Sequence, residues 1–296
     1  MSDPSEPGNH EYIEFILSDE GIVDWKDVAY LNGQNECRNI GLRKIVENAF
    51  PYIKDMYGEI KNPIKIIIHT GDRPDYDVKK DKNTIEFQTI STTYKDDLFP
   101  DYIFGDWWHI GLTDFDKFTD DISTNCIKTI PIYNRVFWAG NLQNIPQRLQ
   151  YKHISKLYPN AIQCLTIKWK SPSEPTKFVK IRDLGQWRMI IDLTGYGWSG
   201  RLKMLPFCKR PLIIANRKFW GWSDFMILKT KNFYMANKDL SNLIQIVNYI
   251  NTNTTKAQLK ADNLYNYVSE KFKFDNVCKY AADIIVKKMR EIEKIV

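Results

Sequence analysis

The sequence predicts an α/β protein built from two domains, and three observations support this fold class. The chain has 296 residues, which is longer than the roughly 100–200 residues of a typical domain. Hydrophobic residues make up 43% of it and aromatic residues 14%, which is enough for two packed cores and excludes a disordered chain. Short β-branched runs that end in turn-prone loops also alternate with segments of helical spacing, as is typical of α/β units.

The first domain is expected over residues 1–133. Alternating or β-branched residues predict its strands, and apolar residues at helical spacing predict one helix that ends at Gly58. The expected strands cover residues 12–17, 64–69 and 86–90, and the helix covers residues 36–57. The aromatic-rich stretch 94–113 contains glycine and proline, so we expect it to form a structured loop that lines a cleft.

The second domain is expected over residues 134–275. Its first strand runs into a loop and then a helix that begins at Pro146, which starts a second α/β repeat. The expected strands are 134–140, 161–169, 189–193 and 211–215, and the expected helices are 146–157, a helix start at 201–207, 240–249 and 257–272. Residues 276–296 form a last helix, expected to pack back towards the first domain.

Charge and cysteine content limit the kinds of ligand and site that the protein can have. The formal charge of +6 is spread along the chain, which suits an anionic small ligand and is too weak to indicate nucleic acid. The five cysteines are widely separated and form no Cys-x-x-Cys pair, so we expect mostly reduced, buried thiols and no metal site. We expect no metal or other cofactor, and no nucleic acid partner.

The N-terminal residues Met1 to Glu14 have neither a basic region nor an apolar core, so they do not form a signal peptide. The longest strongly apolar run, residues 64–68, is far shorter than the ~20 residues that cross a bilayer. We therefore expect a cytoplasmic protein without a transmembrane segment.

The strongest local signal is the run Gly195-Tyr-Gly-Trp-Ser-Gly-Arg201, which lies between a predicted strand and a predicted helix start. Backbone amides that glycine leaves accessible at a helix N-terminus can bind an anion, and an arginine can bind phosphate through two hydrogen bonds. The spacing matches neither a dinucleotide fingerprint nor a P-loop. A tight glycine turn with a surface arginine is the alternative.

Five segments in this order resemble the landmarks of glycosyltransferase family 90, the family of Rumi-type protein O-glucosyltransferases and capsule-associated, lipopolysaccharide-modifying glycosyltransferases. They are Thr70-Gly-Asp-Arg-Pro74, Tyr94-Lys-Asp-Asp-Leu-Phe-Pro100, Val136-Phe-Trp-Ala-Gly140 with Arg148, Gly195–Arg201, and Asp239-Leu-Ser-Asn-Leu243. The resemblance covers the chain from about Ile64 to its C-terminus. The Gly195–Arg201 segment is the most specific of the five.

The resemblance implies a GT-B fold, in which two Rossmann-like domains face each other across a cleft. It also implies an inverting, metal-independent transfer of a sugar of the glucose or xylose type from a UDP-sugar to a hydroxyl of a glycan or protein. At the position that matches the family's general base stands Asp72, whose carboxylate would accept the proton of the acceptor hydroxyl.

Further site residues follow from the same resemblance. Arg148 and Arg201 match positions that contact the donor diphosphate, and Ser199 matches a residue hydrogen-bonded nearby. The loop around Gly195, Gly197 and Trp198, together with Gly140, is expected to complete the donor site. Asp96 is expected to position the sugar or the acceptor. Apart from the resemblance, the aromatic rings of Trp107 and Trp108 suit stacking against a sugar ring or a nucleobase, with packing in the core as the alternative.

Two other interpretations remain. The first is a catalytically silent relative that binds a nucleotide sugar and keeps the donor site. An Asp72 side chain that points away from the cleft, or that is paired with Arg73, would favour this relative over an enzyme. A nucleic-acid-binding protein would need a continuous basic stripe, whereas lysine and arginine here alternate with acids along most helices. The chain fits the short bacterial and viral-like members, which build surface polysaccharides and other glycans, better than the secreted ones.

Overall fold

The computed structural model describes residues 12–28, 36–71, 83–167, 169–171, 174–175, 179–195 and 197–294. Contacts between residues divide the chain into two compact units. The first comprises residues 1–115 and 272–296, and the second comprises residues 116–271. These divisions lie near, but not at, the expected boundaries after residues 133 and 275. In the part of the chain that is described, no helix has both the length and the apolar character that crossing a membrane requires.

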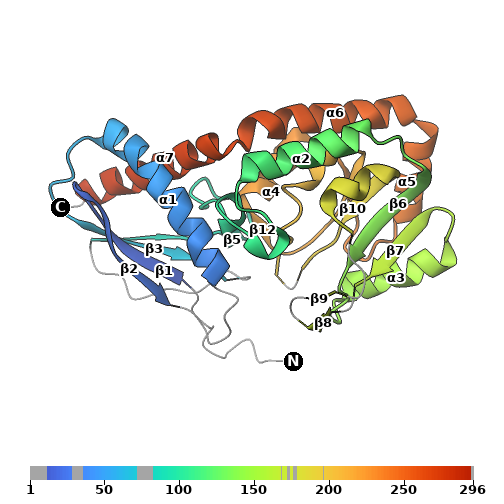
Figure 1. The fold of residues 1–296 in the computed structure, drawn as a ribbon, viewed down its shortest axis with the longest axis horizontal. Helices are drawn as coiled ribbons and strands as arrows, with labels where there is room; N and C mark the ends of the chain where they lie inside the picture. Colours follow the sequence, from blue (N-terminus) through green and yellow to red (C-terminus); the bar gives the residue numbers. More distant parts are fainter. Residues whose placement is uncertain are drawn as a thin grey trace. The chain divides into compact units, whose positions relative to one another are not determined.

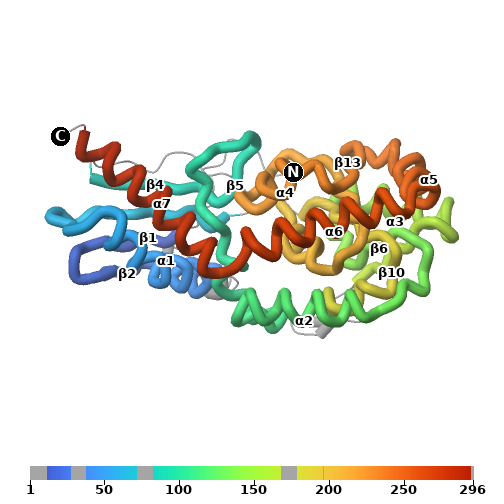
Figure 2. Tube along the Cα trace, turned by 90° about the horizontal axis from the view of Figure 1, so that it is seen from above, coloured from blue at the N-terminus to red at the C-terminus, as the bar shows by residue number. Residues whose placement is uncertain are grey.

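The first unit contains a mixed four-stranded sheet in the order β2-β1-β3-β4. Strand β1 pairs antiparallel with β2 and β3, and β3 pairs parallel with β4. Helices α1 and α7 pack against each other beside this sheet (Figure 2). The elements are β1 Tyr12–Ser18, β2 Gly21–Val28, α1 Glu36–Tyr57, β3 Ile64–His69, β4 Thr84–Phe87, β5 Ile90–Ser91, the 3₁₀ helices η1 Tyr102–Phe104 and η2 Trp108–Ile110, and α7 Phe274–Glu293.

The second unit contains a five-stranded parallel sheet in the order β13-β11-β10-β6-β7. Its strands are β6 Tyr133–Gly140, β7 Ile162–Thr166, β10 Trp187–Asp192, β11 Leu212–Ala215 and β13 Tyr234–Ala236. Buried aliphatic residues from these strands and from α3 and α5 form one core. Such uninterrupted apolar strands are typical of a parallel sheet that is covered on both faces.

Helices surround this sheet, as Figure 1 shows for α2, α3, α4, α5 and α6. The remaining elements of the unit are α2 Phe115–Lys128, α3 Pro146–Leu157, β8 Trp169–Ser171, β9 Glu174–Pro175, η3 Ile181–Gln186, η4 Leu205–Cys208, β12 Trp220–Gly221, α4 Trp222–Thr230, α5 Leu243–Thr252 and α6 Thr254–Lys271. Helix α2 begins at the last residue of the first unit. The prediction of a mixed α/β protein with a parallel sheet is confirmed.

One predicted element is wrong. Residues 201–207 were expected to begin a helix, but residues 201–204 form a turn, followed only by the four-residue 3₁₀ helix η4. Pro206 has no amide hydrogen to continue a helix, and the backbone amides of Met204 and Leu205 both donate to the carbonyl of Arg201. Arg201 therefore stands in a turn, and no α-helix N-terminus follows the glycine-rich loop.

Candidate functional site

The strand order of the second unit predicts where a ligand binds. Strand β7 lies on one side of β6, whereas β10, β11 and β13 follow one another on the other side. The order therefore reverses between β6 and β10, which is the flavodoxin-like arrangement. In open α/β sheets, ligands bind outside the carboxyl ends of the strands at such a reversal. Gly140 ends β6 and Asp192 ends β10, so the site is expected beside these two residues.

Two expected donor-site arginines meet at this point. Arg148, in the first turn of α3, places its guanidinium carbon 5.5 Å from the ring centre of Trp138, and Arg201 lies 5.7 Å from the same ring. Both are held by backbone carbonyls: Arg148 Nε donates to Thr194 at 2.8 Å, and Arg201 Nη1 donates to Ala139 at 2.6 Å. The ring of Trp138 and these carbonyls thus bring together two residues far apart in the sequence.

Asp192 organises the next layer of the site. Its side chain is fully buried; Oδ1 accepts a hydrogen bond of 2.8 Å from Ser199 Oγ and lies 3.8 Å from Arg201 Nη2. Its Oδ2 accepts a hydrogen bond of 2.6 Å from Nη2 of Arg217, which is also buried. Ser199, expected near the donor, is therefore bound to Asp192, which in turn faces Arg201.

The electrostatics of the site favour an anion. The guanidinium groups of Arg148, Arg201 and Arg217 interact with the carboxylate of Asp192. The buried carboxylate of Asp224 interacts with Asp192, Arg217 and Lys203. Four cations and two carboxylates leave this cluster with a local charge of about +2. Burial and the charge of Arg201 lower the pKa of Arg148 to about 10, and burial lowers the pKa of Arg201. Both arginines stay protonated at neutral pH, as arginines in proteins do. Keeping two charged groups partly buried and close together costs free energy, and a bound anion would reduce that cost.

Glycine is required at two positions of the site because other atoms approach closely. A Cβ at Gly195 would stand 2.1 Å from the carbonyl oxygen of Trp198, and one at Gly140 would stand 2.6 Å from the ring of Trp138. The amide of Gly195 also donates to the Trp198 carbonyl at 3.0 Å. This amide is therefore engaged within the loop, and Gly197 lies buried in the same loop.

Gln147, which sequence reasoning missed, joins the loops at this edge of the sheet. Its Nε2 donates to the carbonyls of Asn216 and Lys238 at 3.0 and 3.1 Å, and its Oε1 accepts from the amide of Thr194 at 2.8 Å. One buried amide side chain thus connects the loops that follow β10, β11 and β13. This holds the Thr194 carbonyl in place for Arg148.

The other expected site residues belong to the first unit. Asp96 is exposed and forms an ion pair of 2.8 Å with Lys287 of α7, which lowers the pKa of Asp96. Trp107 is half-buried and Trp108 is half exposed, with the ring of His109 3.8 Å from the Trp108 ring. The expected roles of these residues stay predictions.

Asp72 lies outside the described residues. The segment that leads towards it leaves the carboxyl end of β3 at His69, which is buried and bonded through Nε2 to Glu86 Oε1 at 2.5 Å. The carbonyl of the following residue, Thr70, accepts a hydrogen bond of 2.8 Å from Arg38. Two elements of the first unit therefore anchor the chain at His69 and Thr70.

Comparison with protein families identifies the family of this chain. The sequence profile described as glycosyl transferase family 90 matches residues 53–290, which is most of the chain. The chain belongs to glycosyl transferase family 90. Membership implies glycosyltransferase activity, with a sugar donor and an acceptor as the partners. No match is found among curated proteins.

Asp192 and Arg217 are further functional candidates in this family 90 protein that sequence reasoning missed. Each stands at or just after the carboxyl end of a buried parallel strand, Asp192 on β10 and Arg217 two residues after β11. A charged residue directly after such a strand was the available signal. The pairing between them joins neighbouring strands of the sheet, and no local spacing in the sequence predicts it.

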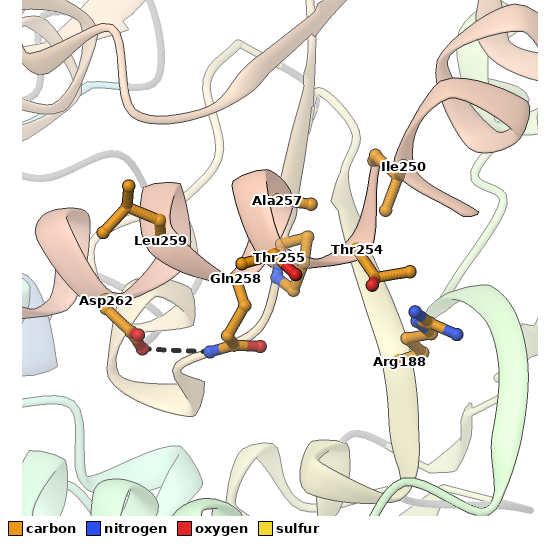
Figure 3. A pocket seen from close by; sticks show the side chains of 9 residues that line it. Arg188, Ile250, Thr254, Thr255, Ala257, Gln258, Leu259 and Asp262 are labelled. Atoms are coloured by element: carbon orange, nitrogen blue, oxygen red, sulfur yellow. Dashed lines mark hydrogen bonds between the residues drawn. The ribbon is translucent and has the colours of Figure 1, made fainter. Parts of the chain in front are cut away.

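A cavity of about 510 Å³ lies elsewhere in this unit (Figure 3). Arg188 near the start of β10, Pro211 before β11 and residues 254–262 of α6 contribute to its lining. A hydrogen bond of 2.9 Å joins Gln258 to Asp262 there. These positions are at the amino ends of the strands, so the cavity is separate from the expected donor-site residues of the family 90 protein. Among the described residues, no cluster of three or more potential metal-ligating side chains is found.

Proposed function

We propose that this chain is an inverting glycosyltransferase that moves a sugar of the glucose or xylose type from a UDP-sugar to a hydroxyl of a glycan or protein. The observation that carries the proposal is the pair of half-buried guanidinium groups, Arg148 and Arg201, held beside Trp138 at the reversal of strand order. A site with a local charge of +2 suits a pyrophosphate, whose oxygens accept paired hydrogen bonds from arginine.

The chemistry requires the site to stabilise a leaving group. As the acceptor oxygen forms its bond to the anomeric carbon, the bond from that carbon to the diphosphate oxygen breaks, and its electron pair leaves with UDP. Arg148 and Arg201 would stabilise the negative charge that develops on the diphosphate. The acceptor proton passes to a general base, which by resemblance is Asp72.

The proposal includes a GT-B arrangement and a metal-independent reaction. The parallel sheet of the second unit has the flavodoxin-like order of a nucleotide-binding domain, which supports its assignment as the donor domain. Since two arginines are available to stabilise the leaving diphosphate, we expect full activity in an excess of chelator. Loss of activity in chelator that manganese restores would contradict this part of the proposal.

Titration with UDP tests the donor site directly. Hydrogen bonds to charged groups contribute about 1.5–3 kcal/mol each, so R148A and R201A should each weaken UDP binding by about 10- to 100-fold. R182A is the matched control, because Arg182 is an exposed arginine of the same unit, paired with Asp121. If R148A and R201A bind UDP as tightly as R182A does, the donor site is assigned wrongly.

The Asp72→Asn variant separates an enzyme from a catalytically silent relative. With UDP-glucose or UDP-xylose as the donor, transfer of the sugar to water or to an acceptor releases UDP. The amount of free UDP therefore measures the bond-breaking step. Wild type should release UDP, whereas D72N should bind UDP normally and release almost none. UDP binding without release by the wild type would favour the silent relative, and undiminished release by D72N would exclude Asp72 as the base.

A further inference from the structure

Charge is distributed unevenly in the second unit. The 52 residues from 122 to 173 contain no aspartate or glutamate, although they contain seven lysines and arginines. The stretch includes the last part of α2, together with β6, α3, β7 and β8. The acid that precedes it, Asp121, is already paired with Arg182 at 3.1 Å. This part of the protein therefore has a positive character that the formal charge of the whole chain conceals.

Large apolar side chains are exposed within the same stretch. Ile130 is 82% exposed and Ile132 is 68% exposed in the loop between α2 and β6, and Leu157 is 61% exposed at the end of α3. Ile127 and Tyr158 are each about half exposed beside them. Large aliphatic residues at such exposure are costly to leave in water, and a group of them marks an interaction surface.

The fold brings these two loops to the same edge of the sheet. One loop precedes β6 and the other precedes β7, and these strands are parallel neighbours in register from Val136 and Ile162 onwards (Figure 1). Both loops are anchored: the amide of Ile132 donates to the carbonyl of Gln186, and the amide of Ile162 donates to that of Tyr158. We define the amino-edge patch as the five exposed apolar residues of these loops and of the last turns of α2 and α3 before them, together with Lys128 and Lys156 at the ends of the same helices.

We propose that the amino-edge patch docks the protein onto a membrane surface that carries anionic lipids. Bulky aliphatic residues and a tyrosine would enter the interface, while Lys128 and Lys156, both exposed, would contact lipid phosphates. The absence of acids from the surrounding sequence means that little repels such a surface. Asp183 on η3, at the amino end of the next strand, is an exposed acid that Arg182 does not offset, since Arg182 is paired with Asp121.

The patch lies at the opposite end of the strands from the donor site. The donor-site residues follow the carboxyl ends of β6 and β10, whereas the patch residues precede the amino ends of β6 and β7. Docking would therefore leave the donor site of this unit uncovered. The docking itself needs neither donor nor acceptor, so its test is independent of the proposed function.

Flotation with vesicles tests the proposal. The full chain should float with vesicles of 70% phosphatidylcholine and 30% phosphatidylglycerol, bind pure phosphatidylcholine far more weakly, and be released in 0.5 M NaCl. A basic residue near an anionic leaflet strengthens binding about fivefold, so K128Q/K156Q should weaken it about 25-fold. The control K61Q/K95Q removes the same charge from exposed lysines of the first unit and should change binding less than threefold.

A second pair of variants tests the apolar residues. I130N/L157N should reduce binding to the anionic vesicles at least tenfold, whereas V23N, at a half-exposed position of the first unit, should leave it unchanged. Failure of the wild type to bind anionic vesicles would overturn the proposal. It would also be overturned if sedimentation showed a wild-type dimer that I130N/L157N converts to monomer, because the patch would then serve self-association.

Discussion

Replacing Arg217 with methionine tests whether the buried pair with Asp192 supports the site. Both side chains are almost completely buried, and their atoms meet at 2.6 Å. Removing one partner of a buried ion pair costs about 3–5 kcal/mol, because the other charge remains buried and unpaired. Asp192 would keep the hydrogen bond from Ser199 and the more distant Arg201, at 3.8 Å. We therefore expect R217M to cost about 3 kcal/mol, at the lower end of that range.

Urea unfolding followed by tryptophan fluorescence measures this cost, because Trp220 lies 4.9 Å from the guanidinium of Arg217. With a denaturant slope of about 2–3 kcal/mol/M, the midpoint should fall by about 1–1.5 M. The R217K variant keeps the charge and should lose less than half as much. The double variant D192N/R217M removes both charges, so its cost should be at least about 2 kcal/mol smaller than the sum of the single costs.

Two outcomes would refute this reasoning. If R217M cost less than about 1 kcal/mol, the pair would behave like an exposed one. If the costs of D192N and R217M were additive, the two residues would not act as a unit, and Arg217 would have no part in holding Asp192 towards Ser199 and Arg201.

Three further predictions concern buried groups of the second unit. Burial raises the pKa of Asp224 from 3.8 to about 6, so the folded state binds more protons than the unfolded state between these values. Stability should therefore fall by about 2 kcal/mol as the pH rises from 4 to 7. D224N should remove this dependence in denaturation curves across that range, and an equal slope in both proteins would contradict it. In G195A the added Cβ would meet the Trp198 carbonyl, so the variant should lose about 1–3 kcal/mol of stability in thermal unfolding and bind UDP more weakly. Wild-type stability and UDP affinity in G195A would show that the loop adapts. Q147L removes three hydrogen bonds to loop backbones and should cost about 3 kcal/mol in urea at about 1 kcal/mol per bond. Q150L, at an exposed position of the same helix, is the control, and a loss below about 0.5 kcal/mol in Q147L would exclude the bridging role.

The strand and helix positions were largely predictable because their signals are local. The β-branched run 64–69 and the helix 146–157 have the observed bounds, since each is flanked by proline or turn residues and has a clear period. Strand β2 and helices α2 and α4 were not predicted. In α4, nearly every side chain of the first half is buried or half-buried, so no polar face marks its period.

The sequence by itself determined the α/β class and the likeness to glycosyl transferase family 90, and it led to the prediction that Arg148 and Arg201 bind the donor, because these depend on local periodicity and on motifs that are read along the chain. Only the tertiary structure decided that both arginines lie beside Trp138, that Asp192 is buried between Ser199 and Arg217, and that exposed isoleucines collect at one edge of the sheet. The physical reason is that pairing between distant strands and burial of charge depend on which segments become neighbours, and spacing along the chain does not specify that.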